Sequence, residues 1–111
     1  DLIISQYKGK EHFKPIYEKL LSDILTFGND IEIAPKNTYV SLRRKKQFAI
    51  LNPATKTRFE IGINLKEQEA EGRLEAEKPK SMCSHKIKIA DINEIDNEII
   101  TWIKRAYENA G

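Results

Sequence analysis

The sequence predicts an α+β domain, in which a five-stranded, mainly antiparallel sheet carries an N-terminal and a C-terminal helix on one face. Residues 38–63 contain three segments in which apolar and polar residues alternate, joined by two basic turns. The flanking segments 12–27 and 95–107 repeat apolar residues at intervals of three and four. A half-apolar sheet and two amphipathic helices bury each other's apolar surfaces. A length of 111 residues is enough for one such core.

The N-terminal third is expected to contain a tail, a helix and a short strand. Residues 1–9 show no periodic pattern and are interpreted as a linker or tail. A helix is predicted over 12–27, where Pro15 falls in the first turn and its missing N–H removes no intrahelical bond. Gly28 is expected to end this helix. Alternation at 31–33 then predicts a short strand.

The three alternating segments should form a sheet with one apolar and one polar face. We expect the following residues to point toward the helices: Val40, Leu42, Phe48, Ile50, Phe59, Ile61 and Ile63. The opposite, open face is expected to carry Tyr39, Ser41, Arg43, Gln47, Ala49, Arg58, Glu60 and Gly62. Turns are predicted at 44–46 and 53–56, the second because Pro53 cannot donate to a strand ladder.

The C-terminal half should contain a loop, a fifth strand and a helix. Residues 66–80 are charged and offer almost no large apolar side chain, so we expect a mobile loop within a single domain spanning 10–111. Alternation at 85–89 predicts the fifth strand. Asp91 and Glu94 lie three residues apart, as in a capping box at the start of a helix.

Composition limits the class of protein. The apolar fraction of 40% and charged fraction of 32% are typical of a globular domain, and no run approaches the roughly 20 apolar residues of a membrane span. No signal-peptide pattern is visible, and we expect the chain to be a domain of a longer protein. The single cysteine, Cys83, cannot form an internal disulfide, so a reducing compartment and a cytoplasmic location are expected.

No residue cluster indicates an enzyme, a metal site or a bound cofactor. Cys83 and His85 are spaced for one strand face, but the chain has no second pair of this kind to complete a metal site. As a nucleophile and base they would stand about 6–7 Å apart. The acidic residues at 91–98 fall at a helix start, where carboxylates stabilise unpaired N–H groups. We therefore expect a non-catalytic domain.

The basic residues of the sheet are the remaining candidate site. Net charge is only +2, but the positive excess lies in the first helix and the sheet. Cations beside an exposed aromatic on an open sheet face form a workable nucleic-acid surface. Alternatively, the basic turn is simply solvated and protects the hairpin from aggregation. The candidate residues are Tyr39, Arg43, Arg44, Lys45, Lys46, Arg58, Lys86 and Lys88.

Several segments resemble a small uncharacterised prokaryotic domain family whose longer members are often labelled "predicted transport protein". They are YVSLR at 39–43 with FAILNP at 48–53, FEIGINL at 59–65, SHKIKI at 84–89 and EIDNEIITWIKRAY at 94–107. The resemblance implies an accessory module, frequently C-terminal to nuclease-like or restriction-type domains. It supplies no catalytic residues, and the chain has no membrane segment to support a transport role.

Two functional expectations follow. The first is a non-catalytic accessory domain of a nuclease or restriction-type protein that binds DNA or RNA through its basic sheet face. The second is a protein-interaction or dimerisation module, because Ala49, Leu51 and Gly62 should form a flat patch on the open face and Trp102 lies at the margin of the last helix. Partners would then be nucleic acid, a nuclease-like domain in the same chain, or a second copy of the domain.

Overall fold

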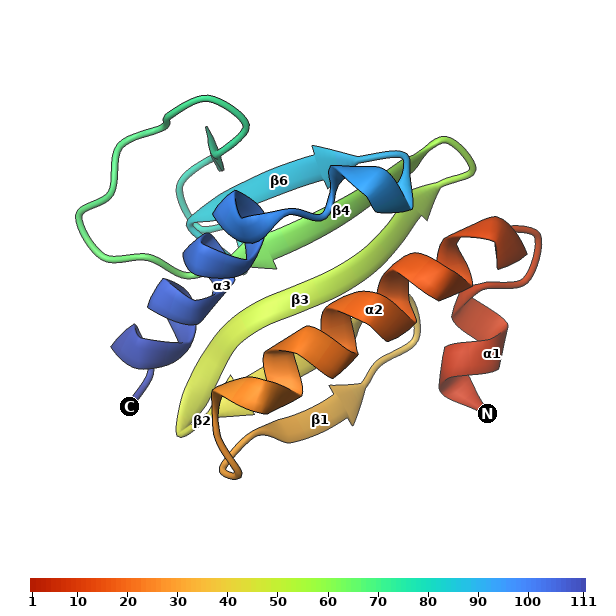
Figure 1. Ribbon diagram of the computed structural model, residues 1–111, viewed down its shortest axis with the longest axis horizontal. Helices are drawn as coiled ribbons and strands as arrows, with labels where there is room; N and C mark the ends of the chain where they lie inside the picture. The colour runs from red at the N-terminus through yellow and green to blue at the C-terminus, as the bar shows by residue number, and fades with distance from the viewer.

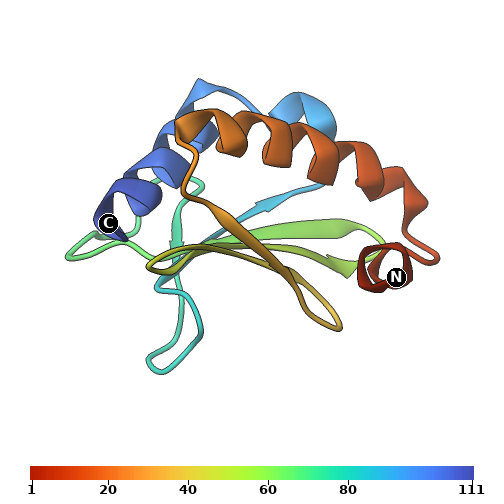
Figure 2. The ribbon, with the colours of Figure 1, turned by 90° about the horizontal axis from the view of Figure 1, so that it is seen from below.

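The computed structural model describes residues 1–111 as two helices packed on one face of a six-stranded sheet, with a third, short helix at the N-terminus (Figures 1 and 2). The helices are α1 (Leu2–Gln6), α2 (Lys14–Ile24) and α3 (Asn97–Asn109), with 3-10 turns at Glu11–Phe13, Leu25–Phe27 and Ile92–Glu94. The strands are β1 (Glu32–Pro35), β2 (Val40–Arg44), β3 (Lys46–Thr55), β4 (Arg58–Ile63), β5 (Glu75–Ala76) and β6 (His85–Ile89). Their order is β1-β2-β3-β4-β6-β5, and all pairings are antiparallel.

The predicted α+β class is confirmed, with a sixth strand added to the expected five. Helix α2 buries Ile16, Tyr17, Leu20 and Ile24, which recur at the spacing expected from the sequence. Helix α3 buries Ile99, Ile103, Ala106 and Tyr107 in the same way. Each large side chain buried between helices and sheet contributes about 1.5–3 kcal/mol before ordering costs. No helix has the length and apolar character needed to cross a bilayer.

Residues 1–9 are more than the linker or tail expected from the sequence. Asp1 caps α1 by accepting hydrogen bonds from the backbone N–H groups of Ile3 and Ile4. Gln6 and Tyr7 are buried, and the Gln6 amide donates to the carbonyls of Lys36 and Tyr39 before β2. The interpretation as a tail is wrong because a five-residue helix is too short to show a helical period.

A β-bulge reverses part of the predicted face assignment in β3. The pairing of β2 with β3 shifts between Leu42 and Arg43, which leaves Phe48 without a partner in the register. Beyond that extra residue, Ala49 and Leu51 are fully buried in the core, while Ile50 lies outside the main core cluster. The prediction that Ile50 faces the helices and Ala49 the open side is therefore wrong, because one inserted residue inverts the alternation.

Helix and strand ends also differ from expectation. The capping box of Asp91 and Glu94 is present, but it caps the 3-10 turn, and α3 begins later, with Asp96 as its N-cap. Strand β3 continues through Pro53 with an irregular register, instead of ending there. Its turn to β4 consists of residues 56–57.

The segment 66–80 is attached to the domain at its middle, where the composition predicts an unstructured loop. Leu74 is 1% exposed and belongs to the core cluster. Glu75 and Ala76 form β5, which pairs with β6. Arg73 Nη2 contacts both carboxylate oxygens of Asp96 at 2.9 Å, and Nη1 donates to the Glu94 carbonyl at 3.0 Å. These contacts fix the segment beside the start of α3.

Candidate nucleic-acid interface

The open face of the sheet carries four of the predicted basic residues, and each of the four has a carboxylate partner. The distances are 3.6 Å for Arg43–Glu32, 2.7 Å for Arg58–Glu60, 3.2 Å for Lys86–Glu77 and 3.3 Å for Lys88–Glu75. The alternation pattern predicts only Glu60 as an offset to the positive charge on this face, and that prediction is wrong. The other three carboxylates come from β1 and from the 66–80 segment, whose positions depend on the tertiary structure.

These ion pairs are open to competition. The side chains of Arg43, Arg58 and Lys88 are each more than 40% exposed. Exposed pairs contribute only about 0–1 kcal/mol, and salt screens them further. A polyanion that offers several phosphates can therefore displace the carboxylates, but the free domain presents a nearly neutral face.

Arg44, which the sequence places in the turn at 44–46, is instead the last residue of β2 and lies on the helix side of the sheet. Its guanidinium stacks over the Tyr107 ring, 4.2 Å from the centroid, and its Nε donates to Asp30 Oδ2 at 2.7 Å. Tyr107 Oη donates to the other Asp30 oxygen at 2.6 Å. These bonds lower the pKa of the Asp30 carboxyl, mainly through Tyr107 and then through Arg44. The same bond to Asp30 raises the pKa of Tyr107. This cluster links α3 to β2 and is structural.

The centre of the open face is apolar and small. Gly62 allows Ile50 and Cys83 to pack over it, since a Cβ there would lie 2.6 Å from Ile50 Cγ1 and 3.0 Å from Cys83 Sγ. The chain before β6 passes beneath the sheet on the side away from the helices (Figure 2). Met82, which is 55% exposed, lines a hollow with Ile50, Gly62 and Cys83. This hollow has a volume of about 240 Å³ and is also lined by Lys86.

The β2–β3 hairpin carries the predicted site residues that have no carboxylate partner. Lys45 forms the turn with a positive φ of 59°, and Lys46 opens β3. No carboxylate lies within 4.0 Å of either ammonium group, nor of Lys66 after β4. Lys66 was not among the predicted site residues, because it belonged to the expected loop.

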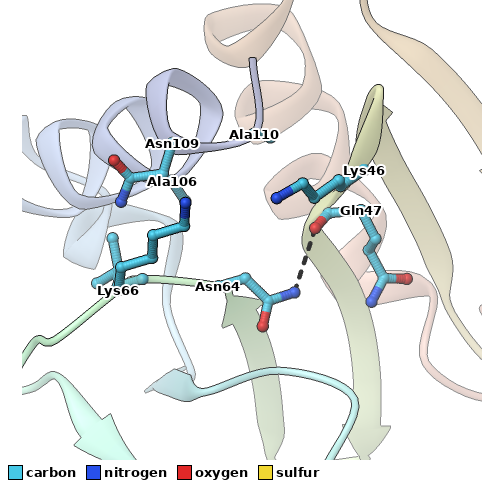
Figure 3. Close-up of a pocket in the computed structure, with 8 residues that line it drawn as sticks. Lys46, Gln47, Asn64, Lys66, Ala106, Asn109 and Ala110 are labelled. Atoms are coloured by element: carbon cyan, nitrogen blue, oxygen red, sulfur yellow. Dashed lines mark hydrogen bonds between the residues drawn. The ribbon is translucent and has the colours of Figure 1, made fainter.

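Lys46 and Lys66 line a cavity of about 260 Å³ between the hairpin, the end of β4 and the C-terminus of α3. Figure 3 shows Lys46 reaching from β3 toward the middle of this cavity and Lys66 rising toward Asn109 of α3. Asn64 forms a fixed part of the wall, since its amide donates to the Gln47 carbonyl at 3.2 Å. The arrangement places two ammonium groups beside amides and small apolar side chains.

A second polar hollow lies at the other end of the sheet, where no pattern in the sequence indicates a site. It has a volume of about 430 Å³, and its lining includes Lys8, Lys10 and Asn52. Lys10 Nζ is already engaged, because it donates to the Pro53 carbonyl at 2.8 Å.

Tyr39, the aromatic among the predicted residues, is half-buried and alternates with Ser41 and Arg43, which places it on the open face.

Cys83 and His85 do not form a reactive pair. His85 is paired with Ile63 on the core side, whereas Cys83 packs over Gly62 on the open side. Burial raises the pKa of the Cys83 thiol to about 12, which keeps it protonated and a poor nucleophile. The His85 ring nitrogens contact Ser84 Oγ at 2.7 Å and the Gln68 carbonyl at 2.8 Å, which secures the start of the 66–80 segment. No group of three or more His, Cys, Asp or Glu side chains is placed to hold a metal ion.

Comparison with known proteins assigns the chain to a family. A family model described as "Domain of unknown function (DUF5655)" matches residues 3–110, nearly the whole chain. No curated protein and no solved structure matches it. The chain therefore belongs to this family, and the expectation of an uncharacterised domain is confirmed. The family description names no ligand or partner, so the nuclease context implied by the resemblance stays a prediction.

Proposed function

We propose, taking membership of the DUF5655 family as the starting point, that this is a non-catalytic accessory domain that binds nucleic acid for a nuclease or restriction-type protein. Lys45, Lys46 and Lys66 make the first phosphate contacts. The ion-paired cations of the open face, such as Arg58 and Lys88, join when phosphates displace their carboxylates. The proposed location is the cytoplasm, in keeping with the free thiol of Cys83.

The observation that carries this proposal is the group of unpaired lysines at the hairpin end. Lys45, Lys46 and Lys66 have no carboxylate within 4.0 Å, whereas Arg43, Arg44, Arg58, Lys86 and Lys88 all do. An unpaired cation gains its full interaction with phosphate and releases the phosphate's counterion. A paired cation must first lose its carboxylate. These contacts position the backbone of a nucleic acid and carry no base specificity.

A salt titration of duplex DNA binding tests the proposal. We expect the affinity of the wild-type domain to fall as salt rises, and the Lys45→Ala/Lys46→Ala/Lys66→Ala variant to have a shallower dependence. Each lost contact reduces the slope of log K against log salt by about 0.9. The matched control is Lys56→Ala/Lys78→Ala/Lys104→Ala, which removes three exposed lysines elsewhere and changes the net charge equally.

Two results would contradict nucleic-acid binding at this end of the sheet. One is an absence of binding to duplex and single-stranded DNA or RNA even at low salt. The other is an equal loss of affinity in the two triple variants, which would mean that only net charge matters.

The alternative function is a protein-interaction or dimerisation module. The patch expected from Ala49 and Leu51 does not exist, because both residues are buried in the core. Met82 takes its place as an exposed apolar residue over Ile50, whereas Trp102 is half-buried and stacks with Arg105 at 4.8 Å. Light scattering distinguishes the cases: a dimer that Met82→Lys converts to a monomer supports this alternative, and a wild-type monomer at high concentration argues against self-association.

A further inference from the structure

We propose that the cavity between the β2–β3 hairpin and α3 binds a phosphomonoester, the group found at the end of a nucleic-acid strand or on a free nucleotide. This inference rests on the proposed function and specifies which phosphate the hairpin end prefers. The polar residues that line the cavity include Lys46, Lys66 and Asn109, and its apolar lining residues are Leu65, Ala106 and Ala110.

The charge of the cavity matches a dianion. Lys46 and Lys66 both line it, and neither ammonium group makes an ion pair with the protein. No side-chain hydrogen bond engages either ammonium, so all their donors are free for a ligand. A phosphomonoester carries a charge of about −1.5 to −2 at neutral pH, whereas a phosphodiester within a strand carries about −1. Two cations in one cavity therefore favour the monoester.

The size and lining also suit the end of a strand. About 260 Å³ is smaller than the typical 300–1,000 Å³ of a drug-sized ligand site, and it accommodates a phosphate with part of its sugar. Leu65, Ala106 and Ala110 give an apolar surface against which the sugar carbons can pack. Asn64 donates to the carbonyls of Gln47 and Met82 and accepts from Ser84 N, so this wall is already in place before a ligand enters.

The partial negative charge at the C-terminus of α3 is an alternative explanation for the position of the two lysines. Helix C-termini carry unpaired carbonyls and partial negative charge, which attract cations. That explanation predicts that Lys46 and Lys66 stabilise the fold. It predicts no preference for a terminal phosphate, and this difference can be measured.

Fluorescence anisotropy with labelled oligonucleotides tests the inference. We compare one sequence carrying a 5′-phosphate, a 3′-phosphate or hydroxyl ends, with a nucleoside monophosphate and inorganic phosphate as competitors. The wild-type domain should bind at least one phosphorylated end roughly tenfold more tightly than hydroxyl ends, the effect of one charge-assisted hydrogen bond. If the dissociation constant of a nucleoside monophosphate, measured by competition, is lower than that of the phosphorylated oligonucleotide, the natural ligand is a free nucleotide.

The variants separate charge from shape. Lys46→Gln/Lys66→Gln should abolish the preference for a phosphorylated end, and Asn109→Phe should do so by filling the cavity while keeping both lysines. Lys104→Gln, on the exposed face of α3, should retain it. Circular dichroism and thermal melts establish that each variant is folded.

The outcomes distinguish this inference from the proposed function. Binding to DNA without a preference for phosphorylated ends, or a preference that survives in both cavity variants, overturns the phosphomonoester site and leaves nucleic-acid binding standing. Binding of a nucleoside monophosphate that depends on Lys46 and Lys66, without affinity for oligonucleotides, supports the site and contradicts the proposed function. A lower melting temperature in Lys46→Gln/Lys66→Gln with unchanged end preference assigns the lysines to the helix end.

Discussion

Replacing Leu74 by alanine is expected to lower the free energy of unfolding by about 2–5 kcal/mol. Leu74 is 1% exposed and is the one residue of the 66–80 segment in the core cluster. A short turn fixes the backbone of Leu74, because Glu71 and Leu74 exchange two backbone hydrogen bonds of 2.9 Å. Alanine removes the buried methyl groups and leaves a cavity, because a close-packed core relaxes only partially around a truncated side chain. Chemical denaturation measures the change.

Limited trypsin digestion reports the local consequence of the same substitution. In the wild-type domain we expect cleavage after Lys66 and Lys80 to precede cleavage after Arg73, whose guanidinium contacts Asp96 and Glu98. In the Leu74→Ala variant Arg73 should become an early site, because the segment has lost its core anchor.

Met82→Ala is the matched control for Leu74→Ala. It truncates a side chain of similar size in the same part of the chain, but Met82 is 55% exposed, so the stability change should stay within about 0.5 kcal/mol. Equal stability changes in the two variants, or early wild-type cleavage after Arg73, would show that Leu74 does not anchor the segment.

Replacing Gly28 by alanine is expected to destabilise the domain by about 1–3 kcal/mol, the range for forcing extra volume into a packed site. Gly28 has an extended backbone with φ 176°, so alanine can adopt its conformation without strain. The cost is steric, because a Cβ at this position would overlap Tyr107 Oη and lie 3.0 Å from Asp30 Oδ1. The Tyr107 hydroxyl must move away, and its hydrogen bond to Asp30 is lost. Thermal denaturation measures the effect.

A double-mutant cycle with Tyr107→Phe identifies the cause. Phenylalanine lacks the hydroxyl that overlaps the new Cβ, and the nearest ring carbon, Cζ, lies 3.2 Å away. Gly28→Ala should therefore cost less in the Tyr107→Phe background than in the wild type. If alanine costs the same in both backgrounds, the close approach to Tyr107 is not what requires glycine.

Much of the candidate interface could be predicted as a set of residues, but not as a surface. The alternation correctly predicted that four basic side chains lie on the open face, because the period of a strand determines the face of the sheet to which each side chain points. They are Arg43, Arg58, Lys86 and Lys88. Their neutralisation by Glu32, Glu60, Glu75 and Glu77 was mostly missed. Three of these four carboxylates belong to other strands or to the 66–80 segment. Contacts between charged residues that are distant in the sequence cannot be predicted from a local pattern.

The sequence alone determined the elements whose signals are local and repeated. The apolar spacing of α2 and α3, the alternation in β2, β4 and β6, and the capping box of Asp91 and Glu94 all describe contacts within a few residues along the chain. Local backbone geometry makes such periods reliable, so the fold class followed from them.

Only the tertiary structure decided the positions that depend on register and on distant contacts. The bulge at Phe48 exchanged the faces of Ala49 and Ile50, and nothing in the local pattern distinguishes an inserted residue from a paired one. Arg44 is stacked and ion-paired because Tyr107 and Asp30, far apart in the sequence, meet beside it. Leu74 became an anchor because it joins the core cluster just before β5 pairs with β6. In each case the deciding energy comes from a contact between residues that the chain brings together only after it folds.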